Sequence, residues 1–138
     1  MAHIRAQIRD AVATAVAGVG LTVKKSRAYP TENDYLFVYT TSENSTRVSM
    51  STLERNLSVL IEFTARGPVD TIDDTLDGYA VLVETLMAAS NLGGLVKDHV
   101  LQSTEIAFDG EGQKPVGLMR MTYDVLYFTD PANPETMR

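Results

Sequence analysis

Acidic side chains gather in the segment from Asp70 to Tyr79, "DTIDDTLDGY". Within it, Asp73, Asp74 and Asp77 have the spacing D-D-x-x-D, in which carboxylates can hold the Mg²⁺ ions that bind a diphosphate. Magnesium prefers a few carboxylates together with phosphate and water, so a row of acids does not by itself define a metal site. A Mg²⁺-dependent enzyme is therefore one hypothesis that this segment raises.

The same segment also fits the start of an amphipathic helix over residues 71–89. At about 100° per residue, the apolar side chains share one face and the acids lie on the opposite face. Asp70 is placed to be the N-cap, and acids in the first turns complement the positive end of the helix dipole. We therefore predict a capped surface helix, whose acidic face is suited to meet basic residues of a neighbouring subunit. The apolar face comprises Ile72, Leu76, Tyr79, Ala80 and Val83.

The remaining candidates for catalysis are weak. The chain has no cysteine, and its two histidines, His3 and His99, have no partner at a spacing typical of metal sites or triads. The stretch "DGEGQKPVG" at Asp109–Gly117 contains glycines and a lysine, but no Gly-Lys-Ser/Thr that opens a helix. We predict that it is a hairpin loop, and that the chain has no catalytic, cofactor-binding or metal-binding residue.

Composition narrows the class of protein. The chain has 138 residues, 44% of them hydrophobic and 22% charged, with a formal net charge of −6. These values predict one globular domain over residues 1–130, followed by a loose tail over 131–138 that holds two prolines. The acidic balance argues against a nucleic-acid binder, which gathers Lys and Arg. No apolar run is long enough for a membrane span or a signal core.

Hydrophobic periodicity predicts the order α-β-β-β-α-β-β. Glycines at 18 and 20 end a first helix over residues 2–17. Its predicted apolar stripe comprises Ile4, Ile8, Ala11, Ala15 and Val19. A polar loop is expected at 41–46. In the strand that ends at Arg66, apolar side chains alternate from Leu57 to Ala65, and Glu62 is expected on the opposite face. This order favours an α+β fold in which an antiparallel or mixed sheet is packed by two amphipathic helices. Strands are expected at 21–29, 35–40, 47–66, 99–108 and 116–128.

Six blocks follow one another in a fixed order: "IRDAVATAVAGV", "SRAYP", "YLFVYT", "LSVLIEFTARG", "DDTLDGYAVLVETLM" and "LGGLVKDHVLQSTEIAFDGEGQKPVGLMRMTYDVLYFT". Taken together, they resemble the tail terminator proteins of long-tailed phages, the lambda-type minor tail protein U family. The resemblance extends from about Ile4 to Thr129 and also rests on the late Asp-Gly-Glu-Gly hairpin. This chain has Asn33-Asp34-Tyr35 where relatives often have a Leu-Pro start.

The resemblance implies a structural role in the virion, with assembly in the host cytoplasm. Such subunits form a ring of about six copies through contacts that close on themselves. The ring binds the end of the tail tube protein, stops tube growth and presents its other face to the head–tail connector. DNA passes through the hole without specific binding, which suits a subunit with a net charge of −6.

We expect the ring contacts to come from polar loops and from exposed charged side chains. The segments Thr41–Arg47 and Gly110–Lys114 are predicted to project. The acidic helix face is expected to meet arginines of a neighbouring copy. The candidate interface residues are Asp70, Asp73, Asp74, Asp77, Arg47, Arg55, Arg66, Glu111 and Lys114.

Three alternatives remain open on the sequence alone. One is another ring protein of the neck, such as a tail-completion or head–tail joining protein. The second is the Mg²⁺-dependent enzyme with Asp73, Asp74 and Asp77 as ligands. The third is an acidic DNA mimic or regulatory module that binds a basic partner. Position in the particle, Mg²⁺ binding and oligomeric state distinguish them.

Overall fold

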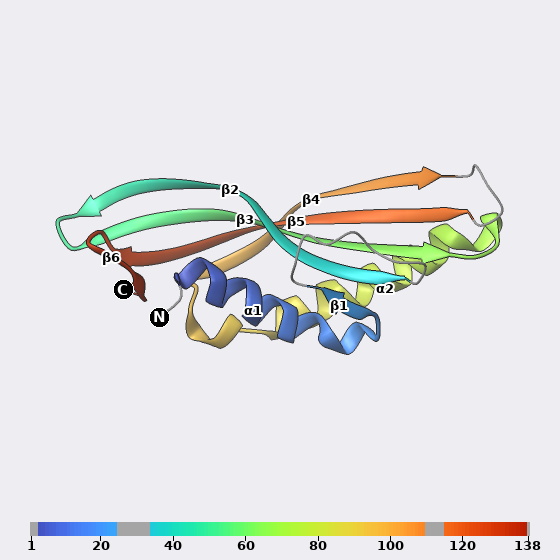
Figure 1. Ribbon diagram of the computed structural model, residues 1–138, viewed down its shortest axis with the longest axis horizontal. Helices are drawn as coiled ribbons and strands as arrows, with labels where there is room; N and C mark the ends of the chain where they lie inside the picture. Colours follow the sequence, from blue (N-terminus) through green and yellow to red (C-terminus); the bar gives the residue numbers. More distant parts are fainter. Residues whose placement is uncertain (1–2, 25–33, 110–114, 138) are drawn as a thin grey trace.

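A computed structural model describes residues 3–24, 34–109 and 115–137 of the chain. A long, twisted sheet forms one layer, and helices α1 (Ile4–Val16) and α2 (Val69–Ala89) both lie on the same face of it (Figure 1). The sheet is mixed, because β1 (Thr22–Lys24) runs parallel to β2 whereas the other pairs are antiparallel. The predicted α+β class and the mixed sheet packed by two helices are confirmed.

Helix α1 follows the predicted apolar period, with its buried stripe displaced by one position. Ile4, Ile8, Val12 and Val16 are buried at steps of four, whereas Ala11 is only half-buried. The larger valines therefore face the sheet in place of the alanines. The helix tightens into a 3-10 turn, η1 (Ala17–Val19), and Gly20 ends it in the left-handed conformation with φ +95°.

Helix α2 starts two residues earlier than the apolar period suggested. Its N-cap is Pro68, and no side chain caps the first turn. The prediction that Asp70 is the N-cap is therefore wrong, and Asp70 lies within the first turn. The fixed φ of proline suits the entrance of a helix, and the backbone N–H of Thr71 bonds to the Pro68 carbonyl at 3.0 Å.

Three strands of 15 residues form the body of the sheet: β2 (Tyr35–Ser49), β3 (Thr52–Arg66) and β5 (Val116–Asp130). The predicted loop at 41–46 is instead part of β2, which continues to a turn at residues 50–51. Its polar residues pair with β3 in an antiparallel ladder, from Ser42↔Ser58 to Thr46↔Glu54. The hairpin consequently extends past the helices as an arm, on the left in Figure 1.

Within the described residues, no other strand pairs with most of the outer edges of the sheet. The strand order is β1-β2-β3-β5-β4, and β1 pairs only with Tyr35–Phe37 of β2. The other outer strand is β4 (Asp98–Asp109). Each outer strand has a register shift at the level of Tyr123, between Thr40 and Ser42 in β2 and between Leu101 and Ser103 in β4. Such bulges increase the local twist, which is visible as the crossing near the middle of Figure 1.

The C-terminal segment forms a strand rather than the loose tail expected for residues 131–138. In β6 (Asn133–Met137), Met137 pairs with Thr129 and Asn133 pairs with Asp130. The pairing of β4 with β5 ends at Asp98 and Leu126, and β5 continues beyond this point. The edge of β5 that β4 leaves free is therefore available to β6.

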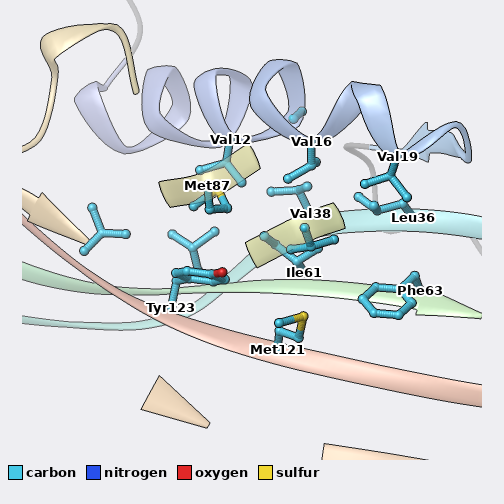
Figure 2. Packing of buried hydrophobic residues seen from close by; sticks show 14 of the residues in the cluster. Val12, Val16, Val19, Leu36, Val38, Ile61, Phe63, Met87, Met121 and Tyr123 are labelled. Carbon is cyan, nitrogen blue, oxygen red and sulfur yellow. The ribbon is translucent and has the colours of Figure 1, made fainter. Parts of the chain in front are cut away.

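The core lies between the helices and one face of the sheet (Figure 2). Val12 and Val16 of α1 and Met87 of α2 pack over Val38 and Ile61. The approach of α2 to β5 is close at Gly117. A Cβ there would lie 2.4 Å from Ile72 Cγ2 and 2.9 Å from Leu76 Cδ1, so glycine is required for this contact. This contact holds the start of α2 against β5, on the side of the sheet where β4 lies.

Candidate assembly surface

The four aspartates of α2 lie away from its buried face and are all exposed. Within residues 3–24, 34–109 and 115–137, no group of three or more acidic or histidine side chains is arranged to hold a metal ion. The D-D-x-x-D spacing thus serves a solvated helix face in the structure, and its carboxylates do not converge. The acids are Asp70, Asp73, Asp74 and Asp77.

Contacts on one flank of α2 establish which way its acidic side chains face. A Cβ at Gly18 would lie 3.4 Å from Leu86 Cδ1, and the ring of Tyr79 meets Phe63 edge-on, so this flank faces α1 and β3. Asp73, Asp77 and Glu84 lie on the other flank, within about 40° of one another at the helical period. This acidic flank therefore overlooks β5 and the outer strand β4.

Tyr123 on β5 supports that orientation. Burial raises the pKa of Tyr123 to about 12, and the negative charge of Glu84 adds to the shift. Glu84 is thus close to β5, as the helical geometry requires.

The three candidate arginines lie in different environments. The Arg55 side chain is only 12% exposed and bonds to Glu43 at 2.9 Å. Arg66 forms an ion pair with Asp34, also at 2.9 Å. Arg47, in contrast, is exposed near the tip of the arm. Glu111 and Lys114 lie outside the described residues, as does the predicted projecting segment 110–114.

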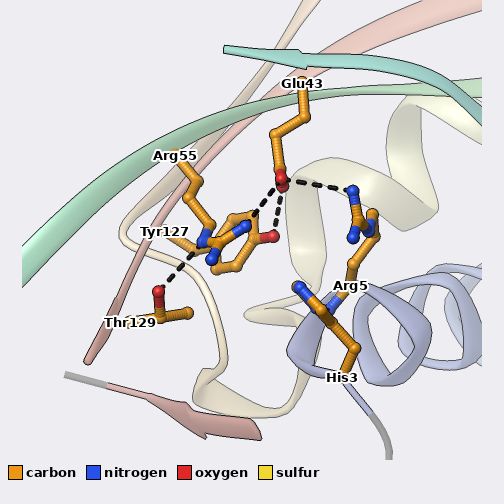
Figure 3. A network of polar contacts seen from close by, with 6 residues as sticks. All are labelled: His3, Arg5, Glu43, Arg55, Tyr127 and Thr129. Atoms are coloured by element: carbon orange, nitrogen blue, oxygen red, sulfur yellow. Dashed lines mark hydrogen bonds and ion pairs between the residues drawn. The ribbon is translucent and has the colours of Figure 1, made fainter. Parts of the chain in front are cut away.

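A buried ion cluster at the base of the arm was not anticipated from the sequence (Figure 3). Glu43 accepts hydrogen bonds from Arg55 at 2.9 Å, from Arg5 at 3.3 Å and from the Tyr127 hydroxyl. Arg55 Nε also donates to Thr129 Oγ1 at 2.9 Å. Burial and the bond to Glu43 raise the pKa of Tyr127. Because these residues come from α1, β2, β3 and β5, the cluster ties the arm to the body.

A second polar network lies on the face of the sheet opposite the helices. Glu62 accepts a hydrogen bond from the Tyr35 hydroxyl at 2.9 Å and pairs with Arg120 at 2.9 Å. Tyr39 also donates to Glu62, at 3.4 Å. Alternation correctly placed Glu62 on this face, but the residue is 8% exposed rather than solvated. Both networks satisfy hydrogen bonding, since no buried polar side-chain atom in the described residues lacks a partner.

Exposed apolar side chains occur on the two outer strands and also on α2, at Val69, Val81 and Leu82. On β4, Ile106 is 60% and Phe108 51% exposed, and on the arm Val48 is 53% and Met50 85% exposed. A hollow of about 310 Å³ between α1 and η2 (Leu92–Gly94) contains only one ionisable side chain, that of Asp10. The outer strands therefore combine exposed apolar side chains with free strand edges in the described part of the chain.

Comparisons with known proteins leave the family open. No protein-family model matches the chain, and no curated protein has a significantly similar sequence. Neither helix in the described parts of the chain is long and apolar enough to cross a membrane.

Proposed function

We propose that this protein is a structural subunit that assembles into a closed ring, of the tail-terminator type, on the end of a phage tail tube. The observation that carries the proposal is the pair of long outer strands, β2 and β4, on opposite sides of one sheet. Outer strands offer unpaired backbone N–H and C=O groups to another chain. At one of these edges, on β4, the apolar side chains of Ile106 and Phe108 are more than half exposed.

The direction of the strands supports a head-to-tail arrangement. Between β2 and β4 the sheet is antiparallel throughout, in the order β2-β3-β5-β4, so β2 and β4 run in opposite directions. A second copy placed alongside without inversion therefore presents its β2 antiparallel to β4. Contacts of this heterologous kind repeat from copy to copy and form a ring when the rotation closes.

The charge balance is compatible with a ring through which DNA passes. Each chain has a formal net charge of −6, and copies arranged in a ring repel phosphates rather than bind them. The copy number of about six and the position at the tube end follow the resemblance described above.

The proposal is tested by removing the gene from the phage that encodes this chain. We expect tails of excess and variable length in electron micrographs, and normal length after complementation with the intact gene. Native mass spectrometry of the purified protein is expected to detect a closed oligomer. Tails of normal length that fail to join heads would instead identify another neck protein and contradict the terminator role.

A further inference from the structure

We propose that the arm of one copy adds as a strand to the outer edge of β4 of the next copy. The inference rests on the proposed ring and specifies its contact. The arm here means Ser42–Met50, and the ledge means Ser103–Asp109 of β4 together with the acidic flank of α2, Asp73, Asp77 and Glu84.

The floor of the ledge is an uninterrupted strand with apolar side chains. β4 pairs with β5 without a register shift from Ser103 to Asp109. Ile106 and Phe108 point to the helix side, because they pair with Met119 and Gly117, which are buried on that face. Both side chains are nevertheless more than half exposed. A strand added here would cover them.

The wall of the ledge is acidic. Phe108 pairs with Gly117, over which Ile72 and Leu76 of α2 lie. Asp73 follows Ile72 and Asp77 follows Leu76 in the sequence, and both lie on the flank of α2 that faces β4. Their carboxylates are therefore next to the apolar floor of the ledge. A strand that fits the ledge must therefore carry a cation on its helix-facing side.

The arm has the matching features. Ser45 and Arg47 point to the helix side, because they pair with Arg55 and Leu53, in phase with the buried Leu57. Arg47 thus supplies a cation for the acidic wall. Val48 and Met50 at the tip supply exposed apolar surface. The sheet order makes this pairing antiparallel, as derived above.

Pairing of β4 with itself is disfavoured by charge. β4 has three acids, Asp98, Glu105 and Asp109, and no lysine or arginine. Two copies of β4 in antiparallel register would oppose Asp98 and Asp109, and like charges directly opposite each other destabilise a sheet. The arm of a second copy is the better occupant because it has an exposed Arg47.

A register that places Arg47 opposite Ile106 also places Thr46 opposite Ala107. The chain has no cysteine, so paired substitutions are specific reporters. Directly opposed residues have Cα atoms about 4.5–5.5 Å apart, within the range that a disulfide spans. We expect Thr46→Cys/Ala107→Cys to give a ladder of covalent multimers after mild oxidation. Within one chain, the residues of β5 that align with Thr46 and with Ala107 are ten residues apart, which corresponds to about 34 Å. An intramolecular disulfide is therefore excluded.

The matched control is Thr46→Cys/Ser103→Cys. Ser103 lies on the same strand and the same face as Ala107, but four residues away, about 13 Å. It is expected to give no ladder. Efficient dimerisation of Ala107→Cys alone would indicate β4–β4 pairing and overturn the inference, as would the absence of a ladder when residues 103, 105, 107 and 109 are each combined with Thr46→Cys.

Charge reversal provides a second test that does not depend on register. Arg47→Glu is expected to weaken assembly by about fivefold or more, and Arg47→Glu/Asp77→Lys to restore it. Both positions are exposed, so unchanged thermal melting of each variant serves as the folding control. Weakening that Asp77→Lys does not relieve would count against this contact.

The inference and the proposed function fail separately. Rings that form although Thr46→Cys gives no ladder with a cysteine at 103, 105, 107 or 109 would refute the arm contact and leave the ring function standing. A crosslinked ladder from a protein whose gene can be deleted without effect on tail length would support the contact and refute the terminator function.

Discussion

Phe63 and Glu62 are neighbours on β3, yet they point to opposite faces of the sheet and are buried by different means. Phe63 is fully buried beneath the helices, in an aliphatic cluster. Glu62 is 8% exposed on the other face, enclosed by Tyr35, Tyr39 and Arg120. On the helix-covered face the stability comes from apolar area and close packing, whereas on the opposite face it comes from a polar network.

The two buried glutamates extend this comparison. The carboxylate side chains of Glu43 and Glu62 are buried to a similar extent. Their arginines differ, because Arg55 is 12% exposed and Arg120 is 36% exposed. Solvent can therefore replace Glu62 as a partner of Arg120, but it has little access to Arg55. The ion cluster at the base of the arm is therefore more sensitive to disruption than the network of Glu62 and Arg120 on the opposite face.

Truncating Phe63 tests the first contrast and has the largest expected effect. Phe63→Ala should lower the free energy of unfolding by about 3–5 kcal/mol, because it removes contacts and leaves a cavity under the helices. The control is Phe37→Ala on the opposite face, where a half-buried ring stacks on Tyr39 at 4.6 Å. It should cost about 1 kcal/mol. Equal losses in urea denaturation would show that the two faces do not differ as described.

Neutralising each glutamate tests the second contrast. Glu43→Gln should lower the free energy of unfolding by about 2–3 kcal/mol, since it leaves the buried charge of Arg55 without a counter-ion. Glu62→Gln should cost about 1 kcal/mol or less, because Arg120 is partly solvated and also lies 3.5 Å from Glu105. Urea denaturation at pH 7 measures both. A larger loss for Glu62→Gln would reverse the order argued from exposure.

The part of the fold that depends on local patterns was predictable from the sequence. The apolar period located both helices to within about two residues at each end, the usual uncertainty of helix boundaries. Alternation from Leu57 to Ala65 identified the buried face of β3. Gly20 was recognised as a helix end because the left-handed conformation favours glycine.

Features that depend on distant partners were not predictable. Residues 41–46 lack apolar side chains and resemble a loop, and only the ladder with β3 makes them a strand. The Glu43–Tyr127 bond joins positions 84 residues apart, so no sequence spacing indicates it. Arg55 was therefore predicted as a surface contact although it is tied to Glu43. The acids of α2 were recognised as an outward face, but their side relative to β4 follows only from Leu86, Tyr79 and Glu84.

Alkaline pH offers the smallest and most local test of the difference between the faces. Burial raises the pKa of Tyr123 to about 12 in the folded state, against about 10 in an unfolded chain. The folded state thus holds the phenolic proton more tightly. The stability that this provides is complete below pH 10 and is lost as pH rises from about 10 to 12.

Between pH 9 and pH 11, the free energy of unfolding of Tyr123→Phe should therefore fall by about 1 kcal/mol less than that of the unmodified protein. Urea denaturation across this range measures the slope, and comparing slopes cancels the change in packing at neutral pH. Tyr39→Phe is the control from the opposite face, where burial and Glu62 raise the pKa but Arg120 opposes the shift. Its slope should lie closer to that of the unmodified protein. If Tyr123→Phe leaves the slope unchanged, the phenol is not protected by the packing of α2 against β5, and the orientation of the acidic flank argued from Glu84 loses one of its supports.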